Sequence, residues 1–415
     1  MQEVFEILSY VFHFKINNYV LEHLLDWDHT HTDPIFRLLF PNQEMLPAEN
    51  YDLLRTYQVA SMPPALIRQM ALEMAEKIAP PSLTFDRCIP RAQDGTPLPG
   101  MYHNYRGQLN LFASPALRTC HAYCAYCFRW AMFNDTPSQN LGSYDDPMLP
   151  VDYLNRHPEI TDVVFTGADP LVMKAEVLHQ YLQPLLDVPS LQVIRIHTKS
   201  LAYWPFRFTT DPDADDLLRV FESVRARGKY LSLSAHCSHP RELTTPPVQE
   251  AVRRVRGAGV GIRCQGPLIK GVNDSSSDWA NIWHQAIALD IQPHAMFMEC
   301  GQNPGHCFQV PMAQALTIFE EAQQSTSGLA RSVLGPLFID QPIRALLAGK
   351  TTLMGETYFV LKPQQAPPFM QANAHLQLIP YDTTRAHPGN LMDLFQVAET
   401  DEVTNPTSPY YAAPS

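Results

Sequence analysis

Three cysteines fall within eight residues of the segment RTCHAYCAYCFRW, which covers residues 118–130. Cys120, Cys124 and Cys127 have the spacing C-x3-C-x2-C. A structural zinc site needs four ligands, usually in two C-x2-C-like pairs, and the other five cysteines form no second pair of that kind. Three thiolates instead suit a [4Fe-4S] cluster that keeps one iron free for another ligand. The spacing therefore predicts an iron–sulfur cluster with one open coordination position.

Alternating strand and helix patterns must position this loop. Short β-rich runs occur at LNLFAS, ITDVVFTG, LQVIRIHT, KYLSLSAH, GVGIRCQG and PHAMFMEC. Helical patterns are expected over 174–186, 214–227, 248–257, 278–288 and 313–323. This alternation favours a parallel sheet with right-handed crossovers. We predict an α/β fold, a partial (β/α)6 barrel in which the cysteine loop follows the first strand.

The remaining sequence predicts three further parts around the barrel. Residues 1–95 contain periodic apolar runs such as ALIRQMALEMAEKI, which predict a helical N-terminal region. The barrel is assigned to 96–330, after a loop-like segment, PRAQDGTPLPGMYHNYRGQ. Residues 331–397 are expected to close the barrel, with GETYFVLKP as an added strand, and 398–415 to form a disordered tail.

Composition favours a globular protein with a small-molecule ligand. The chain has 415 residues, of which 45% are hydrophobic, and a formal net charge of −12. This charge argues against nucleic acid or an anionic membrane as the main partner, since both require a basic surface. No segment approaches the roughly 18 apolar residues of a membrane span. We therefore expect a cytoplasmic protein whose cysteines are thiols or metal ligands.

The cysteine motif, with its expected place after a first barrel strand, resembles that of the radical S-adenosylmethionine superfamily. In that superfamily the free iron chelates the amino and carboxyl groups of S-adenosylmethionine. An electron from the cluster then yields a 5′-deoxyadenosyl radical, which abstracts a substrate hydrogen. The resemblance implies that Arg129, two residues after the last cysteine, pairs with the methionyl carboxylate. The alternative for Arg129 is a solvated surface position.

From about residue 33 to 363 the chain also resembles the lysine 2,3-aminomutase-like enzymes. ITDVVFTGADPLVM is similar to their second-strand motif ending in GGDP, with Ala168 in place of a glycine. The resemblance implies that backbone carbonyls of Gly167, Ala168 and Asp169 hold the ammonium group of S-adenosylmethionine. A tight turn between strand and helix is the alternative for these three residues.

Three later segments add candidate ligand contacts. SLSAHCSHPRELTT and RCQGPLIKGVND resemble the fourth- and fifth-strand motifs, which implies contacts of His236 and Gln265 with S-adenosylmethionine. Either residue is alternatively a hydrogen-bonded core group. Four residues follow the third strand and would contact a polar or anionic substrate at the barrel mouth: His197, Lys199, Tyr203 and Arg207.

The end of the chain departs from the family pattern. The aminomutases carry pyridoxal phosphate on a lysine after a glycine run, and Lys350 in FIDQPIRALLAGKTTLM is the matching catalytic and cofactor-binding candidate. The glycine-poor IRALLAG instead predicts a short helix that would point this lysine elsewhere. Cys300 stands where the lysine enzyme has a carboxylate for the distal amine, so lysine is not the expected substrate. Cys300 is also a candidate catalytic hydrogen donor, or inert packing.

Three functions follow from these observations. The leading one is a 1,2-amino migration on an amino-acid-like substrate, with a [4Fe-4S] cluster, S-adenosylmethionine and pyridoxal phosphate. The second is a radical epimerase or oxidase of a small polar substrate without pyridoxal phosphate. The third is a non-catalytic barrel that binds metal or senses redox state. The resemblance also implies an electron donor such as flavodoxin or ferredoxin, and favours a homo-oligomer.

Overall fold

The structure of the protein is a computed structural model that describes most of the chain. The described residues are 2–78, 88–116, 119–127, 129–130, 142–299, 306–340, 343–365, 370–371, 375–396 and 398–399. Strands β11 (Met370–Gln371) and β13 (Ala398–Glu399) pair with each other. The first two residues of the predicted disordered tail thus belong to a strand, and 400–415 lies outside the described residues. None of the described helices is both long and apolar enough for a membrane span.

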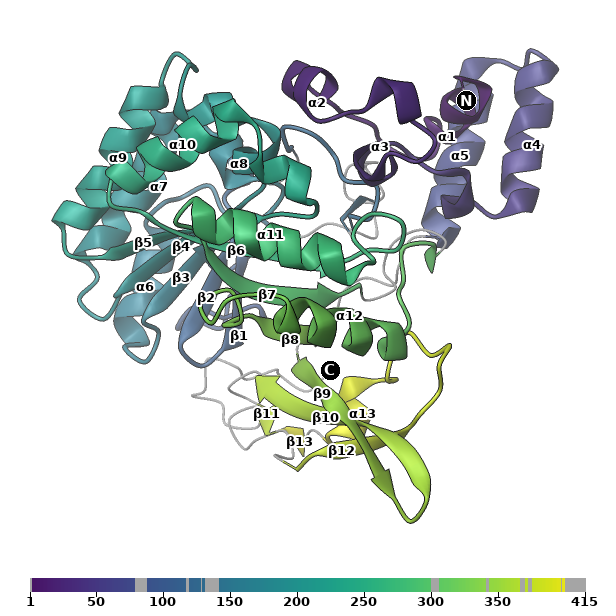
Figure 1. The fold of residues 1–415 in the computed structure, drawn as a ribbon. Helices are drawn as coiled ribbons and strands as arrows, with labels where there is room; N and C mark the ends of the chain where they lie inside the picture. Colours follow the sequence, from purple (N-terminus) through teal and green to yellow (C-terminus); the bar gives the residue numbers. More distant parts are fainter. Residues whose placement is uncertain are drawn as a thin grey trace.

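One large sheet forms the centre of the fold (Figure 1). Within the described residues, its strands follow the order β1-β2-β3-β4-β5-β6-β7-β8-β9-β10-β12. The strands from β2 to β8 are all parallel. They are β2 (Gln108–Leu111), β3 (Asp162–Phe165), β4 (Val193–Thr198), β5 (Tyr230–His236), β6 (Gly261–Leu268), β7 (Gln292–Met298) and β8 (Leu334–Asp340). The first six are the strands predicted from the sequence, which confirms the α/β fold.

Helices connect the parallel strands and cover the outer face of the sheet (Figure 1). They are α6 (Leu149–Arg156), α7 (Ala175–Leu182), α8 (Ser200–Tyr203), α9 (Ala214–Ala226), α10 (Pro246–Gly257), α11 (Ser276–Ala288) and α12 (Met312–Gln324). The Thr245 hydroxyl accepts from the amide of Val248 to cap α10. The Ser275 hydroxyl caps α11 in the same way. Such caps satisfy amides that lack partners in the first helical turn, so local sequence sets where these helices begin.

Strand β4 shows how the sheet divides apolar from polar side chains. Ile194 and Ile196 are fully buried, whereas Arg195 and His197 on the opposite face are half-buried. Side chains alternate between the two faces of a strand, so the isoleucines pack under the helices and the polar residues line the other face. We call this other face the inner face of the sheet.

The sheet curls toward a barrel without pairing its two edges in the part of the chain that the structure describes. The Arg344 guanidinium of β9 (Ile343–Leu353) lies 4.7 Å from the ring centroid of Tyr105 in β1 (Met101–Tyr105). These two strands are far apart in the strand order, so their side chains meet only because the sheet bends. The predicted partial barrel is confirmed.

The predicted loop before the barrel is wrong at its end. Residues 101–105 form β1, which pairs antiparallel with β2 and joins it through Arg106 and Gly107. All five residues of β1 are buried. Tyrosines beside a two-residue turn ending in glycine are a hairpin signal, and the proline-rich stretch before them concealed it.

The predicted helix at IRALLAG is also wrong. Residues 343–353 form β9, which pairs with β8 on one side and with β10 (Glu356–Gln365) on the other. Strand β10 pairs in turn with β12 (Gln377–Pro380) and confirms the strand predicted at GETYFVLKP. Alanine and leucine favour helix, but cross-strand pairing with two neighbours outweighs so weak a preference.

Helices form the N-terminal part of the chain, as the sequence predicts. They are α1 (Gln2–Leu8), α2 (Asn18–His23), α3 (Pro34–Leu39), α4 (Ala48–Val59) and α5 (Pro64–Ile78). Helices α1, α4 and α5 stand together beyond the sheet, at the upper right of Figure 1. Helices α2 and α3 lie between that group and the sheet, which places them beside the cysteine loop.

Candidate functional site

The cysteine loop follows β2 and is fastened to the N-terminal region by backbone hydrogen bonds. The amide of Tyr123 donates to the carbonyl of Lys15 at 2.9 Å, and the amide of Ala125 donates to the carbonyl of Leu38 at 2.8 Å. The loop also bonds within itself, from the amide of Cys127 to the carbonyl of Cys124 at 3.0 Å. Two segments distant in sequence therefore set the shape of this loop.

The three thiols of the loop lie close together, in residues that are partly buried. Burial raises the pKa of Cys124 to about 11, with Cys127 adding to the rise. Burial also raises the pKa of Cys120, and Asp169 and the other two thiols raise it further. Because a cation must replace these protons, metal binding here would release protons.

The donor set fits an iron–sulfur cluster better than a single metal ion. Among the described residues, no three His, Cys, Asp or Glu side chains converge on a point where one ion would sit. A zinc site needs such convergence, whereas each iron of a cubane cluster takes its own thiolate. Three neighbouring, partly buried thiols, without a fourth ligand beside them among the described residues, are the donors that a [4Fe-4S] cluster with one open iron requires.

Arg129 and Gly167, two of the predicted ligand-binding residues, meet beside the thiols. The Arg129 Nη1 donates to the carbonyl of Gly167, and its guanidinium carbon lies 5.9 Å from the ring centroid of Phe112. Burial lowers the pKa of Arg129, while Cys127 and Cys120 act in the opposite direction. A guanidinium held in this place suits a carboxylate, which it can bind through two parallel hydrogen bonds.

The turn after β3 is tied to the start of the cysteine loop. The amide of Ala168 donates to the carbonyl of Ala116, and the amide of Asp169 donates to the carbonyl of Thr119, both at 3.2 Å. Gly167 has φ of +132°, a conformation that glycine adopts without the strain other residues would feel. The turn thus brings backbone groups of Gly167, Ala168 and Asp169 to the loop.

The Asp169 carboxylate is occupied by contacts within the protein. It is 2% exposed and accepts from the amides of Leu171 at 3.0 Å and Lys199 at 2.9 Å. The hydroxyls of Thr198, at 2.8 Å, and Ser200, at 3.1 Å, also donate to it. Asp169 therefore joins the ends of β3 and β4, and any ligand contact would come from its backbone.

His236 and Gln265 also come together, on the inner face of β5 and β6. Gln265 Nε2 lies 3.0 Å from His236 Nε2, and the rings of His236 and His197 are 6.1 Å apart. Burial, then Lys199 and Arg129, lowers the pKa of His236 to about 3. The imidazole is therefore neutral at neutral pH, so it contacts a ligand as a hydrogen-bonding group and not as a charge.

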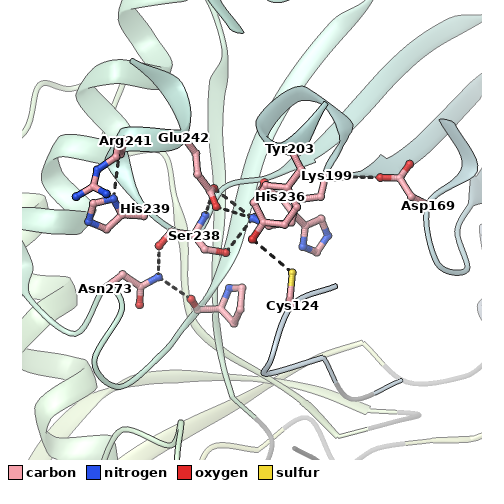
Figure 2. A network of polar contacts seen from close by, with 11 residues as sticks. Cys124, Asp169, Lys199, Tyr203, His236, Ser238, His239, Arg241, Glu242 and Asn273 are labelled. Carbon is pink, nitrogen blue, oxygen red and sulfur yellow. Dashed lines mark hydrogen bonds and ion pairs between the residues drawn. The ribbon is translucent and has the colours of Figure 1, made fainter. Parts of the chain in front are cut away.

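A buried ion pair between Lys199 and Glu242 lies close to Cys124 (Figure 2). Lys199 Nζ is 2.9 Å from Glu242 Oε1, and the Glu242 side chain is fully buried. Glu242 also accepts from the amide of Ser238 at 2.7 Å. The Tyr203 hydroxyl lies 3.5 Å from Cys124 Sγ, and Lys199 Nζ lies 4.3 Å from the Tyr203 ring centroid. The network thus places a lysine charge and a hydroxyl donor beside a candidate cluster ligand.

The residues expected to contact substrate after β4 have different roles. Lys199 and Tyr203 belong to the network behind Cys124. Arg207 is 3% exposed and donates to Asp213 at 2.7 Å and to the carbonyl of Leu171 at 2.9 Å. His197 differs from the other three: within the described residues, its Nε2 is a buried side-chain polar atom without a hydrogen-bond partner. A fully buried carboxylate pairs with Lys199 and a half-buried one pairs with Arg207, so these ion pairs occupy both cations, and their contact with a substrate stays a prediction.

Lys350 does not meet the cysteines. Strand β9 begins at Ile343, opposite Asp340 at the end of β8, and runs antiparallel to it. Lys350 is exposed and pairs with Phe359 in the hairpin of β9 and β10. Lys350 lies seven residues, or about 23 Å at roughly 3.3 Å per residue, from the start of β9. An exposed lysine in this hairpin does not fit the role of holding pyridoxal phosphate beside the loop. Cys300, the candidate hydrogen donor, lies outside the described residues.

Stability should fall in acid because His236 is buried in its neutral form. Its folded-state pKa of about 3 lies below its ordinary value of 6.5, so the unfolded chain binds the proton first as pH falls. The free energy of unfolding then decreases from about pH 6.5 downward, by up to ~1.4 kcal/mol per pH unit for one histidine. Urea midpoints at about pH 7 and pH 5 should show a smaller loss for His236→Gln than for the wild type. His31→Gln, at an exposed position, should keep the wild-type loss; an unchanged slope in His236→Gln contradicts the prediction.

Comparison with known proteins identifies relatives of one kind. No protein-family model matches the chain. A "Putative L-lysine 2,3-aminomutase" of Aquifex aeolicus is 30% identical over 263 residues, 62% of this chain and 65% of that protein. The L-lysine 2,3-aminomutase of Fusobacterium nucleatum is 26% identical over 57% of this chain and 52% of its own length. That of Haemophilus influenzae is 29% identical over 57% of this chain and 68% of its own length.

The matched region and the site lead to the same assignment. The chain spans about half to two thirds of the length of these relatives. A solved radical SAM methyltransferase from Sphaerobacter thermophilus shares 16% identity at a TM-score of 0.39, covering 67% of this chain and 83% of that one; a score this low has no bearing on fold or function. With its three-cysteine loop and its aminomutase relatives, the chain is similar to the lysine 2,3-aminomutases, which is the family that its sequence motifs resemble.

Proposed function

We propose that the protein is a radical S-adenosylmethionine enzyme that rearranges a small, amino-acid-like substrate. The observation that carries this proposal is the grouping of the three loop cysteines with Arg129 and Gly167 at the ends of β2 and β3. The names of the relatives, L-lysine 2,3-aminomutases, support an isomerase of the aminomutase type. Lysine itself is not the proposed substrate, because Cys300 replaces the family carboxylate.

Each group at the site has a defined task under this proposal. When bound, a [4Fe-4S] cluster and S-adenosylmethionine supply a 5′-deoxyadenosyl radical that removes a hydrogen atom from the substrate. Arg129 would bind a carboxylate, and the carbonyls of the turn at 167–169 would accept from an ammonium group. His236, neutral and paired with Gln265 at 3.0 Å, would orient a polar group without adding charge. Burial of these residues excludes water from the place where a radical must survive.

The position of Lys350 favours a second reaction type. Amino migration in the family depends on pyridoxal phosphate, and the exposed Lys350 lies seven residues into β9, in its hairpin with β10. An epimerisation or oxidation of a small polar substrate does not need pyridoxal phosphate. After hydrogen abstraction, the substrate radical would regain a hydrogen atom from a thiol donor in the first case and lose an electron to an acceptor in the second. A reduced flavodoxin or ferredoxin as electron donor, homo-oligomer formation and cytoplasmic location remain predictions from the family and the sequence.

Production of 5′-deoxyadenosine tests the proposal. The protein with its reconstituted cluster, supplied anaerobically with S-adenosylmethionine and dithionite, is expected to release 5′-deoxyadenosine, measured by mass spectrometry. If no product forms, binding of S-adenosylmethionine to the cluster separates an enzyme that waits for its substrate from a barrel without catalysis. No product and no binding would overturn the proposal.

Pyridoxal phosphate binding separates the two reaction types. Stoichiometric pyridoxal phosphate that is lost in Lys350→Ala, but retained in the exposed control Lys362→Ala, would support amino migration. Wild-type protein that retains no pyridoxal phosphate after dialysis would support the epimerase or oxidase. The geometry of β9 predicts the latter result.

A further inference from the structure

Three arginines reach the inner face of the sheet below the candidate S-adenosylmethionine residues. Arg195 in β4 pairs in register with Ser232 in β5, and Ser234 pairs with Arg263 in β6. Paired residues of neighbouring parallel strands point to the same side of a sheet, so these side chains share the inner face. Gln265 lies on the same face, two residues or about 7 Å along β6 from Arg263.

The third arginine, Arg344 of β9, faces the same region from across the curled sheet. The pKa of His294 is lowered to about 4 by burial and then by Arg263, Arg195 and Arg344. One imidazole in β7 is therefore close to all three guanidinium groups. Burial, with Arg195, His236 and Arg344 next in effect, also lowers the pKa of His197 well below its ordinary value.

Carboxylates of the described residues do not balance the positive charge of this face. Arg195 has an acidic partner, Asp162, at 2.7 Å. Arg263 and Arg344 have no ion-pair partner among the described residues, although the whole chain carries a net charge of −12. Arg344 donates to the neutral amide oxygen of Gln365 at 3.1 Å, and its other side-chain hydrogen-bond partner is the neutral phenol of Tyr105. Three guanidinium groups against one carboxylate leave an excess of two positive charges.

Several buried polar atoms of the same face also lack partners. Among the described residues, no hydrogen bond is made by Arg263 Nε, Arg344 Nε, Ser232 Oγ or His197 Nε2, and all four atoms are buried. A buried donor without a partner costs free energy, and an unpaired buried charge costs more. Four such atoms on one face are therefore explained best by a ligand that accepts their hydrogen bonds.

We propose that this arginine face, formed by Arg195, Arg263, Arg344, His197 and Ser232, binds a dianionic group of a small molecule. The excess of two charges selects a phosphate monoester or a pair of carboxylates over a single carboxylate. Guanidinium forks suit both groups because they donate two parallel hydrogen bonds to paired oxygens. A ligand anchored there would extend along the inner face past Gln265 toward the cysteine loop. That this ligand is the substrate rests on the proposed radical function; the anion site does not.

Anion binding to the protein with its cluster reconstituted tests the site. Inorganic phosphate and succinate would be titrated separately by calorimetry at constant ionic strength, without S-adenosylmethionine or reductant. Saturable one-to-one binding of at least one of them is expected, and the better anion identifies a phosphate or a dicarboxylate ligand. Binding of neither would overturn the proposal. Because no radical chemistry is measured, this result stands whether or not 5′-deoxyadenosine is ever detected.

Variants of Arg263 decide whether the anion binds where we propose. Arg263→Gln is expected to weaken binding by at least about tenfold, the typical effect of losing a hydrogen bond to a charged group. Arg263→Lys, which keeps the charge but not the fork, should fall between this variant and the wild type. Arg253→Gln, on the outer side of α10 and 72% exposed, should bind as the wild type does. Equal affinity in Arg263→Gln and wild type, with equal circular dichroism and cluster content, would overturn the proposal.

Discussion

Cys124→Ala is expected to abolish 5′-deoxyadenosine formation, with a loss of more than about 100-fold, because even residues outside the first ligand shell typically change metal affinity or activity by 10–100-fold. Cys124 is one of three loop thiols whose pKa is raised by burial, and its sulfur lies 3.5 Å from the Tyr203 hydroxyl. Removing it leaves two thiolates for a cluster that needs three. Iron and sulfide analysis should show that the cluster fails to assemble stoichiometrically.

Cys88→Ala is the matched control for that variant. Cys88 is also buried, but it lies beside Tyr105, at the start of β2 and not at the end where the loop begins. Its variant should keep both cluster and product. A Cys124→Ala protein that retains a full cluster and wild-type product formation would show that the loop is not the cluster site.

Glu242→Leu is expected to destabilise the protein by about 3–5 kcal/mol, the typical result of removing one member of a buried ion pair. The Glu242 side chain has no exposure and Lys199 has 12%, so the remaining lysine charge would stay out of water without a carboxylate. Burial alone would lower the pKa of Lys199, but Glu242 and Cys124 outweigh it and raise that pKa. Urea unfolding, compared at midpoints with equal slopes, measures the loss.

Two further variants show whether the charge is the cause. Lys199→Met combined with Glu242→Leu removes both charges, so most of the lost stability should return. Asp216→Ala breaks an exposed ion pair with Arg219 on the surface of α9 and should change the midpoint little. If Glu242→Leu unfolds at the same midpoint as Asp216→Ala, the pair does not stabilise the fold. If the double variant is no better than the single one, lost packing and not the charge is responsible.

Local patterns predict most of the barrel because they depend on neighbouring residues. The six predicted strands and the helices between them appear with nearly the expected bounds. The wrong predictions concern segments whose secondary structure depends on pairing with strands distant in the sequence. Residues 343–349 are favourable for a helix on their own, yet β8 and β10 convert them to a strand. The strand at 101–105 likewise forms because β2 returns beside it.

For the candidate site, too, local sequence patterns predict some features and long-range contacts decide the others. The spacing of the cysteines and the resemblance of the strand-end motifs are sufficient to nominate the cluster loop, Arg129, the turn at 167–169, His236 and Gln265. The structure brings these residues together at the strand ends, and their roles remain proposals. The sequence does not reveal that Lys199 pairs with Glu242, since the two follow different strands. Its place after the third strand suggested that Lys199 contacts substrate, but the structure shows that its charge is paired with the buried Glu242.

Spacing along the chain thus predicts a cluster loop, an α/β order and a resemblance to one family, because ligand spacing and side-chain periodicity are local properties. Folding alone decides which charges meet. It holds the thiols with backbone bonds from Lys15 and Leu38, carries Lys350 away along β9, and gathers Arg263 and Arg344 from strands distant in sequence. Contacts of this kind depend on how far the sheet curls and in which register its strands pair, and no short segment contains that information.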